Sequence, residues 1–257
     1  MSNSPLVSYT QLSPNHSGKR YKPISRISPH CVVGQLTAEG IGKCFAKATR
    51  LASCNYGIGY DGRVALVVEE GNRSWCTSDR DNDQRAVTIE CASDRKKPYA
   101  MTDAVYKSLI NLCVDICKRN GKKKLLWFGD KAKTLAYEPA DDEMVITVHR
   151  WFKNKACPGD WLYSRLGDLA AKVTAKLASG ETPTAPMAPA APERTKVSYL
   201  VRVTADALNI RKGPGTKYEI TGKITNKGAY TIVEESAGWG RLKSGAGWIS
   251  LAYTKKI

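Results

Sequence analysis

The sequence predicts an α/β domain, with a mixed central sheet flanked by helices, followed by a small all-β domain. Strand-like and helix-like patterns alternate along the first part of the chain, which favours strands and helices packed in layers. After it, short runs of valine, isoleucine, tyrosine and threonine are separated by glycine turns, a pattern typical of a small barrel. We therefore expect an N-terminal extension over residues 1–23, an α/β domain over 24–178, a Pro/Ala-rich linker over 179–195 and a barrel over 196–257.

The elements of the α/β domain follow from local patterns. Strands are expected at five short apolar runs: residues 24–27, 64–68, 86–91, 125–128 and 144–148. Helices are expected at three stretches: residues 37–50, 102–121 and 160–177. Thr37 and Thr102 are suitable N-caps, and Gly121 is a typical residue after a helix end. The stretch from Gly57 to Gly62 has the spacing of a dinucleotide-binding loop, but a strand-like run follows it, so we expect a hairpin turn.

Composition limits the class of partner. The 257 residues include 40 Lys or Arg and 24 Asp or Glu, and the formal net charge of +16 favours an anionic partner such as nucleic acid, a membrane surface or a bacterial cell wall. No apolar run approaches the roughly 20 residues of a transmembrane helix, and the first residues lack the pattern of a secretory signal. We therefore expect synthesis in the cytoplasm, with most of the eight cysteines as buried thiols.

Two of the three histidines follow predicted strands, at sheet edges where clefts form. His30 comes shortly after the first strand, and His149 directly follows the apolar run that ends at Val148. Cys157 begins a Cys-Pro-Gly turn that can bring its thiol back toward His149. Two imidazoles and one thiolate form a zinc ligand set that leaves the fourth position for water. From the spacing alone, buried histidines with ordinary hydrogen bonds remain the alternative.

These residues lie in a pattern that resembles the zinc N-acetylmuramoyl-L-alanine amidases, a family that includes phage endolysins and the animal peptidoglycan recognition proteins. The resemblance covers roughly the whole predicted α/β domain, and the His-x7-Cys-Pro end is its most specific part. It implies that His30, His149 and Cys157 bind Zn²⁺. It also implies that Glu90, within Val-Thr-Ile-Glu, acts as the base and that Lys155 stabilises the oxyanion.

Two positions depart from that family pattern. Cys54 stands where some members carry an active-site tyrosine, so that this role is unfilled or passes to Tyr56. Trp75 is followed by Cys76, whereas many members have a Trp-His pair. Neither change removes a predicted zinc ligand, and we expect Tyr56 and Trp75 to contact the substrate.

The C-terminal segment resembles bacterial SH3-like domains. The resemblance rests on the run Leu-Asn-Ile-Arg-Lys-Gly-Pro-Gly from Leu208 and on two Gly-Trp pairs that contain Trp239 and Trp248. It implies binding to the cell wall, with Tyr218 and Trp239 lining a groove for sugar or peptide and Trp248 in the core. A tethered wall-binding domain would raise the local concentration of substrate for the catalytic domain.

Together these features predict a two-domain, zinc-dependent peptidoglycan amidase, most like a phage endolysin, that cleaves the amide between N-acetylmuramic acid and L-alanine. One alternative is a cysteine peptidase of the wall, with Cys31 or Cys44 as nucleophile and His149 as base. Another is a non-catalytic protein that binds peptidoglycan. A nucleic-acid binder would suit the charge, but the sequence contains no recognised reading motif, so we expect no nucleic-acid partner.

Overall fold

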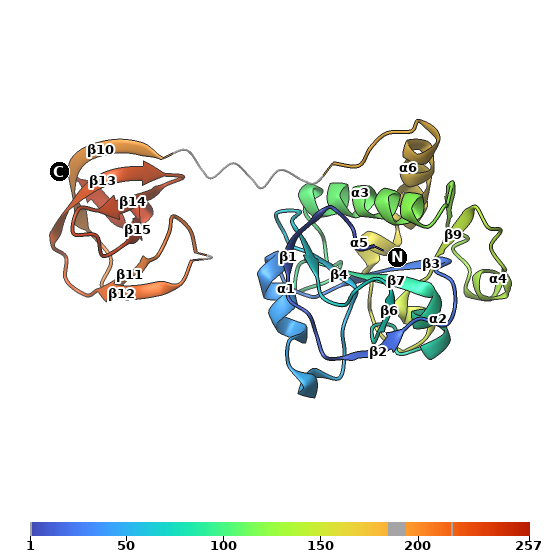
Figure 1. The fold of residues 1–257 in the computed structure, drawn as a ribbon. Coiled ribbons are helices and arrows are strands. Elements are labelled where there is room, and N and C mark those ends of the chain that lie inside the picture. The colour runs from blue at the N-terminus through green and yellow to red at the C-terminus, as the bar shows by residue number, and fades with distance from the viewer. Residues whose placement is uncertain (1, 185–193, 217) are drawn as a thin grey trace. The chain divides into compact units, whose positions relative to one another are not determined.

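Figure 1 shows a computed structural model that describes residues 2–184, 194–216 and 218–257. The chain divides into two compact units, Met1–Ala188 and Pro189–Ile257, and each is described here by itself. Most of the predicted linker lies outside the described residues. The first residues of this linker, 179–184, are described, and the carbonyl oxygen of Thr184 accepts a hydrogen bond from the side-chain amide of Asn111 (3.0 Å). Across the described stretches, we find no helix with the length and apolar character needed to span a membrane.

The first unit contains nine strands and six α-helices within its described residues. In chain order they are β1 (Val7–Thr10), β2 (His16–Lys19), β3 (Arg26–Cys31), α1 (Ala38–Phe45), β4 (Tyr56–Ile58), β5 (Val64–Leu66), β6 (Asn72–Ser74), α2 (Arg80–Arg85), β7 (Ala86–Cys91), α3 (Asp103–Arg119), β8 (Lys124–Leu126), α4 (Lys131–Ala136), β9 (Glu143–Ile146), α5 (Asp160–Tyr163) and α6 (Leu166–Ala178). Two short 3₁₀ turns, Ala48–Arg50 and His149–Trp151, follow α1 and β9.

Seven of these strands form one mixed sheet, in the order β1-β5-β4-β7-β3-β9-β8. Every neighbouring pair is parallel except β4 and β5, which form an antiparallel hairpin. The hairpin turn is closed by a bond from the backbone N–H of Gly59 to the carbonyl of Arg63 (2.9 Å). The predicted mixed α/β architecture is therefore confirmed, as is the turn in place of a dinucleotide-binding loop.

Helices pack on both faces of the sheet because successive strand residues point to opposite sides. On β5, Val64 and Leu66 belong to the main apolar core together with α3, whereas Ala65 packs with Ile41 of α1 in a second cluster. Figure 1 shows α3 and α6 side by side, and the two helices are in contact. α3 begins where the sequence predicts, because the hydroxyl of Thr102 accepts from the backbone N–H of Val105 (3.2 Å).

The bounds of several predicted elements differ from the structure. The strand expected over 24–27 is β3, which extends to Cys31 and therefore contains His30. The helix expected over 37–50 ends at Phe45, and a 3₁₀ turn follows it. The helix expected over 160–177 is two helices, because Arg165 leaves the helical conformation (φ −107°, ψ 0°) and its guanidinium bonds back to the carbonyl of Trp161 (2.9 Å). The strand expected to end at residue 148 ends at Ile146, so His149 lies in the following 3₁₀ turn.

The segment that the sequence suggests as an extension, residues 2–23, contributes β1 to the sheet and β2 to a small pair with β6. Arg20 anchors it, because its guanidinium donates to the carbonyls of Asp83, Gln84 and Ala86 and to the side chain of Asn55. Residues 2–23 are thus part of the first unit through these polar contacts and through Leu6, which is buried in the main apolar core.

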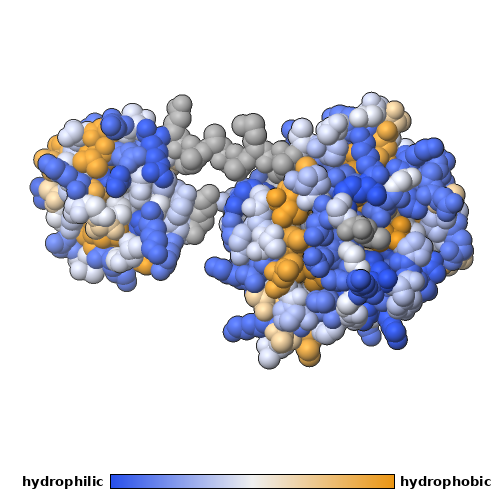
Figure 2. All heavy atoms as spheres, viewed as in Figure 1, coloured by the Kyte–Doolittle hydropathy of each residue, from blue (hydrophilic) through white to orange (hydrophobic). Residues whose placement is uncertain are grey.

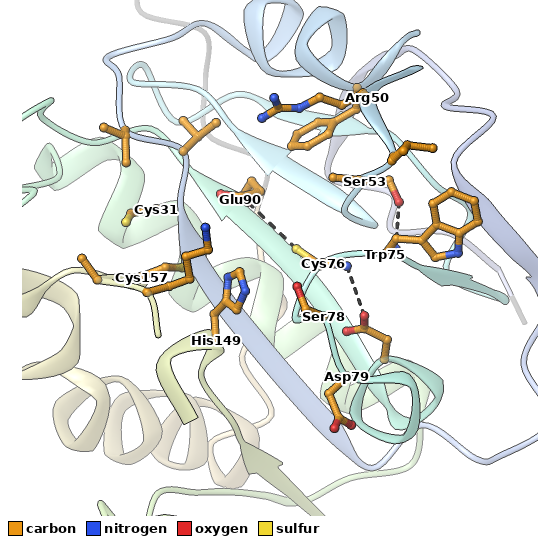
Figure 3. Close-up of a pocket in the computed structure, with 18 of the residues that line it drawn as sticks. Cys31, Arg50, Ser53, Trp75, Cys76, Ser78, Asp79, Glu90, His149 and Cys157 are labelled. Atoms are coloured by element: carbon orange, nitrogen blue, oxygen red, sulfur yellow. Dashed lines mark hydrogen bonds between the residues drawn. The ribbon is translucent and has the colours of Figure 1, made fainter. Parts of the chain in front are cut away.

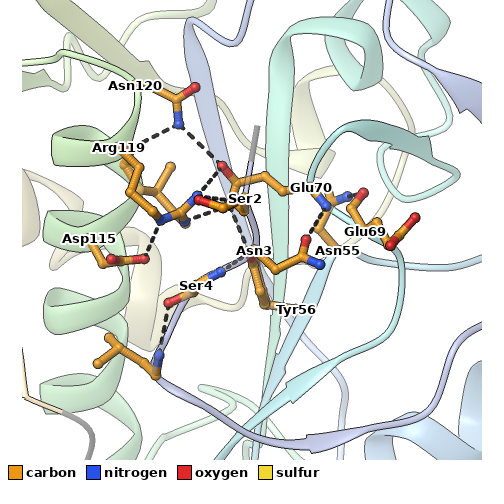
Figure 4. A network of polar contacts seen from close by, with 12 residues as sticks. Ser2, Asn3, Ser4, Asn55, Tyr56, Glu69, Glu70, Asp115, Arg119 and Asn120 are labelled. Carbon is orange, nitrogen blue, oxygen red and sulfur yellow. Dashed lines mark hydrogen bonds and ion pairs between the residues drawn. The ribbon is translucent and has the colours of Figure 1, made fainter.

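A buried ion pair holds the same segment against α3 (Figure 4). The carboxylate of Glu70 is fully buried and accepts two parallel bonds from Arg119, at 2.8 Å and 2.7 Å. It also accepts from the amide of Asn120 (3.2 Å) and from the hydroxyl of Tyr56 (2.7 Å). That hydroxyl in turn accepts from the backbone N–H of Ser4 (2.9 Å).

The second unit is all-β among its described residues, as predicted. Its strands are β10 (Thr195–Val203), β11 (Leu208–Arg211), β12 (Ile220–Ile224), β13 (Ala229–Ser236), β14 (Trp239–Leu242), β15 (Trp248–Ser250) and β16 (Thr254–Lys256). They form an antiparallel sheet in the order β12-β11-β15-β14-β13-β10-β16. Trp248 is 3% exposed and belongs to the interior, as expected. The visible surface is mostly hydrophilic, with scattered hydrophobic patches (Figure 2).

Candidate metal centre

One face of the central sheet carries a row of polar residues that are buried or, for Glu90, half-buried. Ser28 and His30 on β3 alternate with core residues, as do Thr88 and Glu90 on β7. The strand register pairs Ser28 with Thr88 and His30 with Glu90. Thr147, directly after β9, contacts Ser28 through their hydroxyl oxygens (2.5 Å). Three neighbouring strands therefore bring polar side chains to the sheet face opposite α3.

The structure brings together the three residues predicted to bind metal. One candidate ligand atom from each of His30, His149 and Cys157 lies within 4.8 Å of the others. The Sγ atom of Cys157 is 3.2 Å from Nδ1 of His30, and the two imidazole ring centroids are 5.2 Å apart. The Nε2 atoms of both histidines are buried and have no hydrogen-bond partner in the described chain. Because buried polar atoms nearly always have a partner, these nitrogens are available to a ligand.

The surroundings favour the metal-binding forms of these side chains. Burial lowers the pKa of His30 well below its usual value, and the neighbouring His149 lowers it further. Burial and the charge of Lys155 also lower the pKa of His149. Both rings are therefore held neutral, which is the form that binds metal. Burial and contact with Cys31 raise the pKa of Cys157, and a bound cation would offset this cost by stabilising the thiolate. The three residues thus fit a divalent metal ion.

A cleft of about 890 Å³ opens beside this group, and Glu90 lies in it (Figure 3). Burial raises the pKa of Glu90 to about 7, although Arg50, on the same cleft, acts in the opposite direction. The Oε2 atom of Glu90 has no hydrogen-bond partner within the described residues. A carboxyl group whose pKa is near neutral can both accept and return a proton. Lys155 also lines the cleft and is exposed.

The cleft rim contains unusual backbone conformations. Four non-glycine residues that line it have positive φ: Val33 (56°), Leu51 (51°), Ser78 (61°) and Tyr99 (61°). Only a fifth residue of the described chain, Ala237, shares this property. Backbone strain of this kind gathers at functional sites. Val33 and Leu51 remain 47% and 74% exposed, so the rim presents apolar side chains to a ligand.

The two aromatic residues predicted to contact substrate have different positions. Trp75 lines the cleft, and its indole N–H donates to Ser17 (2.7 Å). The prediction for Tyr56 is wrong, because this side chain is fully buried and its hydroxyl donates to Glu70. In the strand register Tyr56 pairs with Ile89, which lies in the core, and Gly57 is the residue that pairs with Glu90.

In the second unit, Trp239 lines a pocket of about 350 Å³ together with Arg211 and Tyr253. Tyr218, which the sequence suggests for the same groove, is not among the described residues that line it. Its ring lies against Gly213, where a Cβ atom would come within 2.6 Å of the ring. Of the predicted pair, Trp239 lines this pocket, whereas Tyr218 is not among the described residues that line it.

Several residues of the polar sheet face have no role assigned from the sequence. Asn82 supports this face, because its side-chain amide donates to Ser28 (3.1 Å) and accepts from Thr147 (2.9 Å). A signal for these positions exists in the sequence. Three strand ends share an apolar-polar-apolar pattern before the functional residue: Ile-Ser-Pro-His30, Val-Thr-Ile-Glu90 and Ile-Thr-Val-His149.

The two thiols considered as nucleophiles also differ in position. Cys31 lines the cleft and contacts Cys157. Cys44 lies on α1 and is absent from the described residues that line the cleft.

Comparison with known proteins assigns both units. The profile of N-acetylmuramoyl-L-alanine amidases matches residues 20–160, and that of bacterial SH3 domains matches residues 206–255. Comparison with curated protein sequences finds no significant match. Among solved structures, the hydrolase AmiA of Staphylococcus aureus, in complex with its ligand, has a TM-score of 0.50 at 13% identity, covering 70% of this chain and 87% of that chain.

Two further solved structures are similar to this chain. A mutant endolysin from Bacillus subtilis has a TM-score of 0.46 at 14% identity, covering 67% of this chain and 99% of its own. A Drosophila peptidoglycan recognition protein has a TM-score of 0.43 at 14% identity, covering 62% and 91%. At such identities the likeness to AmiA supports the fold alone. The amidase profile covers more than half of the sequence and spans His30, His149 and Cys157, and the chain therefore belongs to the N-acetylmuramoyl-L-alanine amidase family.

Proposed function

We propose that the protein hydrolyses the amide between N-acetylmuramic acid and L-alanine in peptidoglycan, with a zinc ion bound by His30, His149 and Cys157. The observation that carries this proposal is the convergence of two buried imidazoles and one thiol, from segments far apart in the sequence, beside an open cleft. Zinc prefers nitrogen and sulfur ligands, and three protein ligands are typical of a catalytic site in which water or substrate completes the coordination.

The neighbouring side chains suit hydrolysis of an amide. A bound zinc ion would supply a Lewis acid for the scissile carbonyl and lower the pKa of water at the site. Glu90 would take the proton of the attacking water, since its carboxyl is buried in the cleft with one oxygen unpartnered in the described chain. It would then deliver this proton to the leaving nitrogen. Lys155, whose charge acts on His149, would stabilise the negative charge that develops on the carbonyl oxygen.

The cleft suits a ligand that is part sugar and part peptide. Its walls combine the apolar side chains of Val33, Leu51 and Trp75 with the guanidinium of Arg50. Aromatic and aliphatic groups can pack on the apolar faces of such a polymer, and a guanidinium can pair with a carboxylate of the peptide.

The second unit would keep the enzyme on the wall. Residues 196–257 contain 11 Lys or Arg and 4 Asp or Glu, a balance that favours anionic wall polymers. Trp239 and Tyr253 supply aromatic surface in its pocket. An amidase domain joined to such a unit is suited to lysis of bacteria in the manner of a phage endolysin, because tethering raises the local concentration of substrate.

The test is digestion of purified bacterial cell walls with the full chain, followed by mass analysis of the products. Amidase activity releases peptides with a free L-alanine N-terminus and leaves glycan strands with unsubstituted lactyl groups. Chelation of metal should abolish this release, and added zinc should restore it. If the active protein contains no divalent metal, or if new N-termini arise only within the stem peptide, the proposal is wrong and a peptidase with Cys31 as nucleophile becomes the better explanation.

A further inference from the structure

A second set of candidate metal ligands lies next to the first. One ligand atom from each of His30, Cys76 and Glu90 lies within 4.8 Å of the others. The Sγ atom of Cys76 is 4.0 Å from Oε1 of Glu90, as the dashed line in Figure 3 shows. In the same view the side chains of Cys76 and Glu90 point toward one another within the cleft. The set differs from the first in that it contains a carboxylate and shares His30.

The fold holds these side chains in place without a ligand. The backbone N–H of Cys76 donates to the carboxylate of Asp83 (3.1 Å), and the hydroxyl of Thr77 donates to the same carboxylate (2.6 Å). Asp83 belongs to α2, so the turn that carries Cys76 is attached to a helix. Glu90 is fixed on β7 beside His30 by the strand register. The geometry of the set is therefore formed in advance, which reduces the entropic cost of binding an ion.

An unpartnered buried atom that the first set does not contain gives an independent indication of a ligand. Seven buried side-chain nitrogen or oxygen atoms of the described residues have no hydrogen-bond partner, and one of them, Oε2 of Glu90, belongs to this set alone, whereas Nε2 of His30 belongs to both sets. His30 is 1% exposed. Its other nitrogen, Nδ1, contacts Cys157 of the first set. If the first ion lowers the pKa of the remaining ring N–H enough for that proton to pass to solvent, the ring of His30 can be shared as an imidazolate between two neighbouring ions, one on each nitrogen.

We propose that Cys76, Glu90 and His30 form a second site, which binds a thiophilic divalent cation such as Zn²⁺ or Cd²⁺ next to the first ion. A thiolate, an imidazole and a carboxylate together select such ions rather than Mg²⁺ or Ca²⁺, which require mostly oxygen ligands. The second ion binds more weakly than the first, because its binding requires the shared imidazole of His30 to release its remaining ring proton. Occupancy of this site engages Glu90, so that excess zinc inhibits hydrolysis. This inhibitory consequence rests on the proposed role of Glu90, whereas the binding itself does not.

The experiment measures metal stoichiometry on the full chain. Metal-free protein, kept reduced with a phosphine, is titrated with Cd²⁺, and bound ions are counted by equilibrium dialysis and by thiolate-to-cadmium ultraviolet absorbance. Residues 196–257 contain no cysteine or histidine, so thiolate signals report on the first unit. The parent should bind two ions in two steps. Cys76→Ala and the near-isosteric Cys76→Ser should each bind one, with the first step retained.

Two further variants serve as controls. Cys44→Ser removes a half-buried thiol of α1 and should bind two ions like the parent. His149→Ala disrupts the first set and should retain a single step that is lost in the double variant with Cys76→Ala. A parent that binds one ion at saturation, or a Cys76→Ser protein that still binds two, would overturn the proposal and leave Cys76 and Glu90 as a thiol–carboxyl contact without a metal.

Activity provides a second readout. For each protein, the hydrolysis rate in excess zinc is compared with its own rate at one equivalent of zinc. The rate of the parent should fall by about 10²-fold, which is the lower end of the effect of removing a general base. The rate of Cys76→Ser should change little between the two conditions. If the parent binds two ions but releases no L-alanine termini under any condition, the proposed function fails while the second site stands. If the parent hydrolyses walls with one ion bound and never binds a second ion, the second site is disproved while the proposed function stands.

Discussion

Replacing Arg119 with alanine tests how strongly the buried ion pair of Figure 4 stabilises the first unit. Glu70 is fully buried, and the Arg119 side chain is 16% exposed. The variant would leave the Glu70 carboxylate with two neutral donors, Tyr56 and Asn120, and without a cation on its two oxygens. Loss of one partner of a buried ion pair costs about 3–5 kcal/mol, because the remaining charge stays buried. This is a large part of a total stability of roughly 5–15 kcal/mol.

Calorimetry of the full chain measures this effect. For a unit of this size, 1 kcal/mol corresponds to about 2–4 °C, so Arg119→Ala should lower the unfolding temperature of the first unit by about 10 °C. A matched control is Lys172→Ala, since Lys172 and Asp168 have the same i,i+4 spacing as Arg119 and Asp115 but are about half exposed. An exposed pair of this kind contributes about 0.5 kcal/mol.

A double variant that also neutralises Glu70 separates the effect of the buried charge on stability from the effect of side-chain packing. In the double variant Arg119→Met with Glu70→Gln, the buried carboxylate is gone and the stem of residue 119 is kept, so part of the lost stability should return. The reasoning is refuted if Arg119→Ala and Lys172→Ala shift the transition by the same small amount. It is also refuted if the double variant is less stable than Arg119→Ala.

Four further outcomes are expected. Cys157→Ser should lower the bound zinc measured by elemental analysis and abolish wall hydrolysis, because a serine hydroxyl does not supply a thiolate; undiminished zinc would contradict the ligand assignment. Glu90→Gln should retain zinc and lower the turnover rate by about 10²–10⁴-fold, and a parental rate would exclude Glu90 as the base. The Arg63 guanidinium lowers the pKa of Glu39 from 4.5 to about 2, so this pair contributes stability that is present above about pH 4.5 and lost as the pH falls toward 2. Glu39→Gln should therefore lose less stability than the parent over that interval in circular-dichroism melts, and identical pH profiles would argue against the pair. Trp239→Ala should weaken sedimentation with purified walls while hydrolysis of a soluble muropeptide is retained; equal sedimentation would place wall binding elsewhere.

The sequence predicts those parts of the fold that depend on local apolar patterns. α3 is predicted correctly because Thr102 caps it and its core residues recur at helical spacing. β7 is predicted with its full bounds, since it combines β-branched residues in a short run. The N-terminal strands are not predicted, because Arg20 holds them through bonds to backbone carbonyls that leave no periodic trace in the sequence.

The candidate site could be predicted in part. The sequence points to His30 and His149 because histidine is rare in this chain, and to Cys157 because it lies close to His149 in sequence. Cys76 could not be assigned to the site in this way, since a bond to Asp83 and the neighbouring strand, rather than sequence proximity, bring it to Glu90. Tyr56 does not take over the role left open at Cys54, because the strand register pairs Tyr56 with Ile89 and its side chain lies in the core.

The left-handed residues around the cleft have a consequence for laboratory evolution. An L side chain in this conformation costs about 1–2 kcal/mol relative to its preferred backbone, so glycine at Val33 or Leu51 would relieve the strain. Laboratory selection for thermal stability alone would therefore enrich substitutions to glycine at these two positions. Each such change would also remove an exposed apolar side chain from the cleft rim. If the rim binds substrate as proposed, the more heat-tolerant variants would bind the cell wall less well.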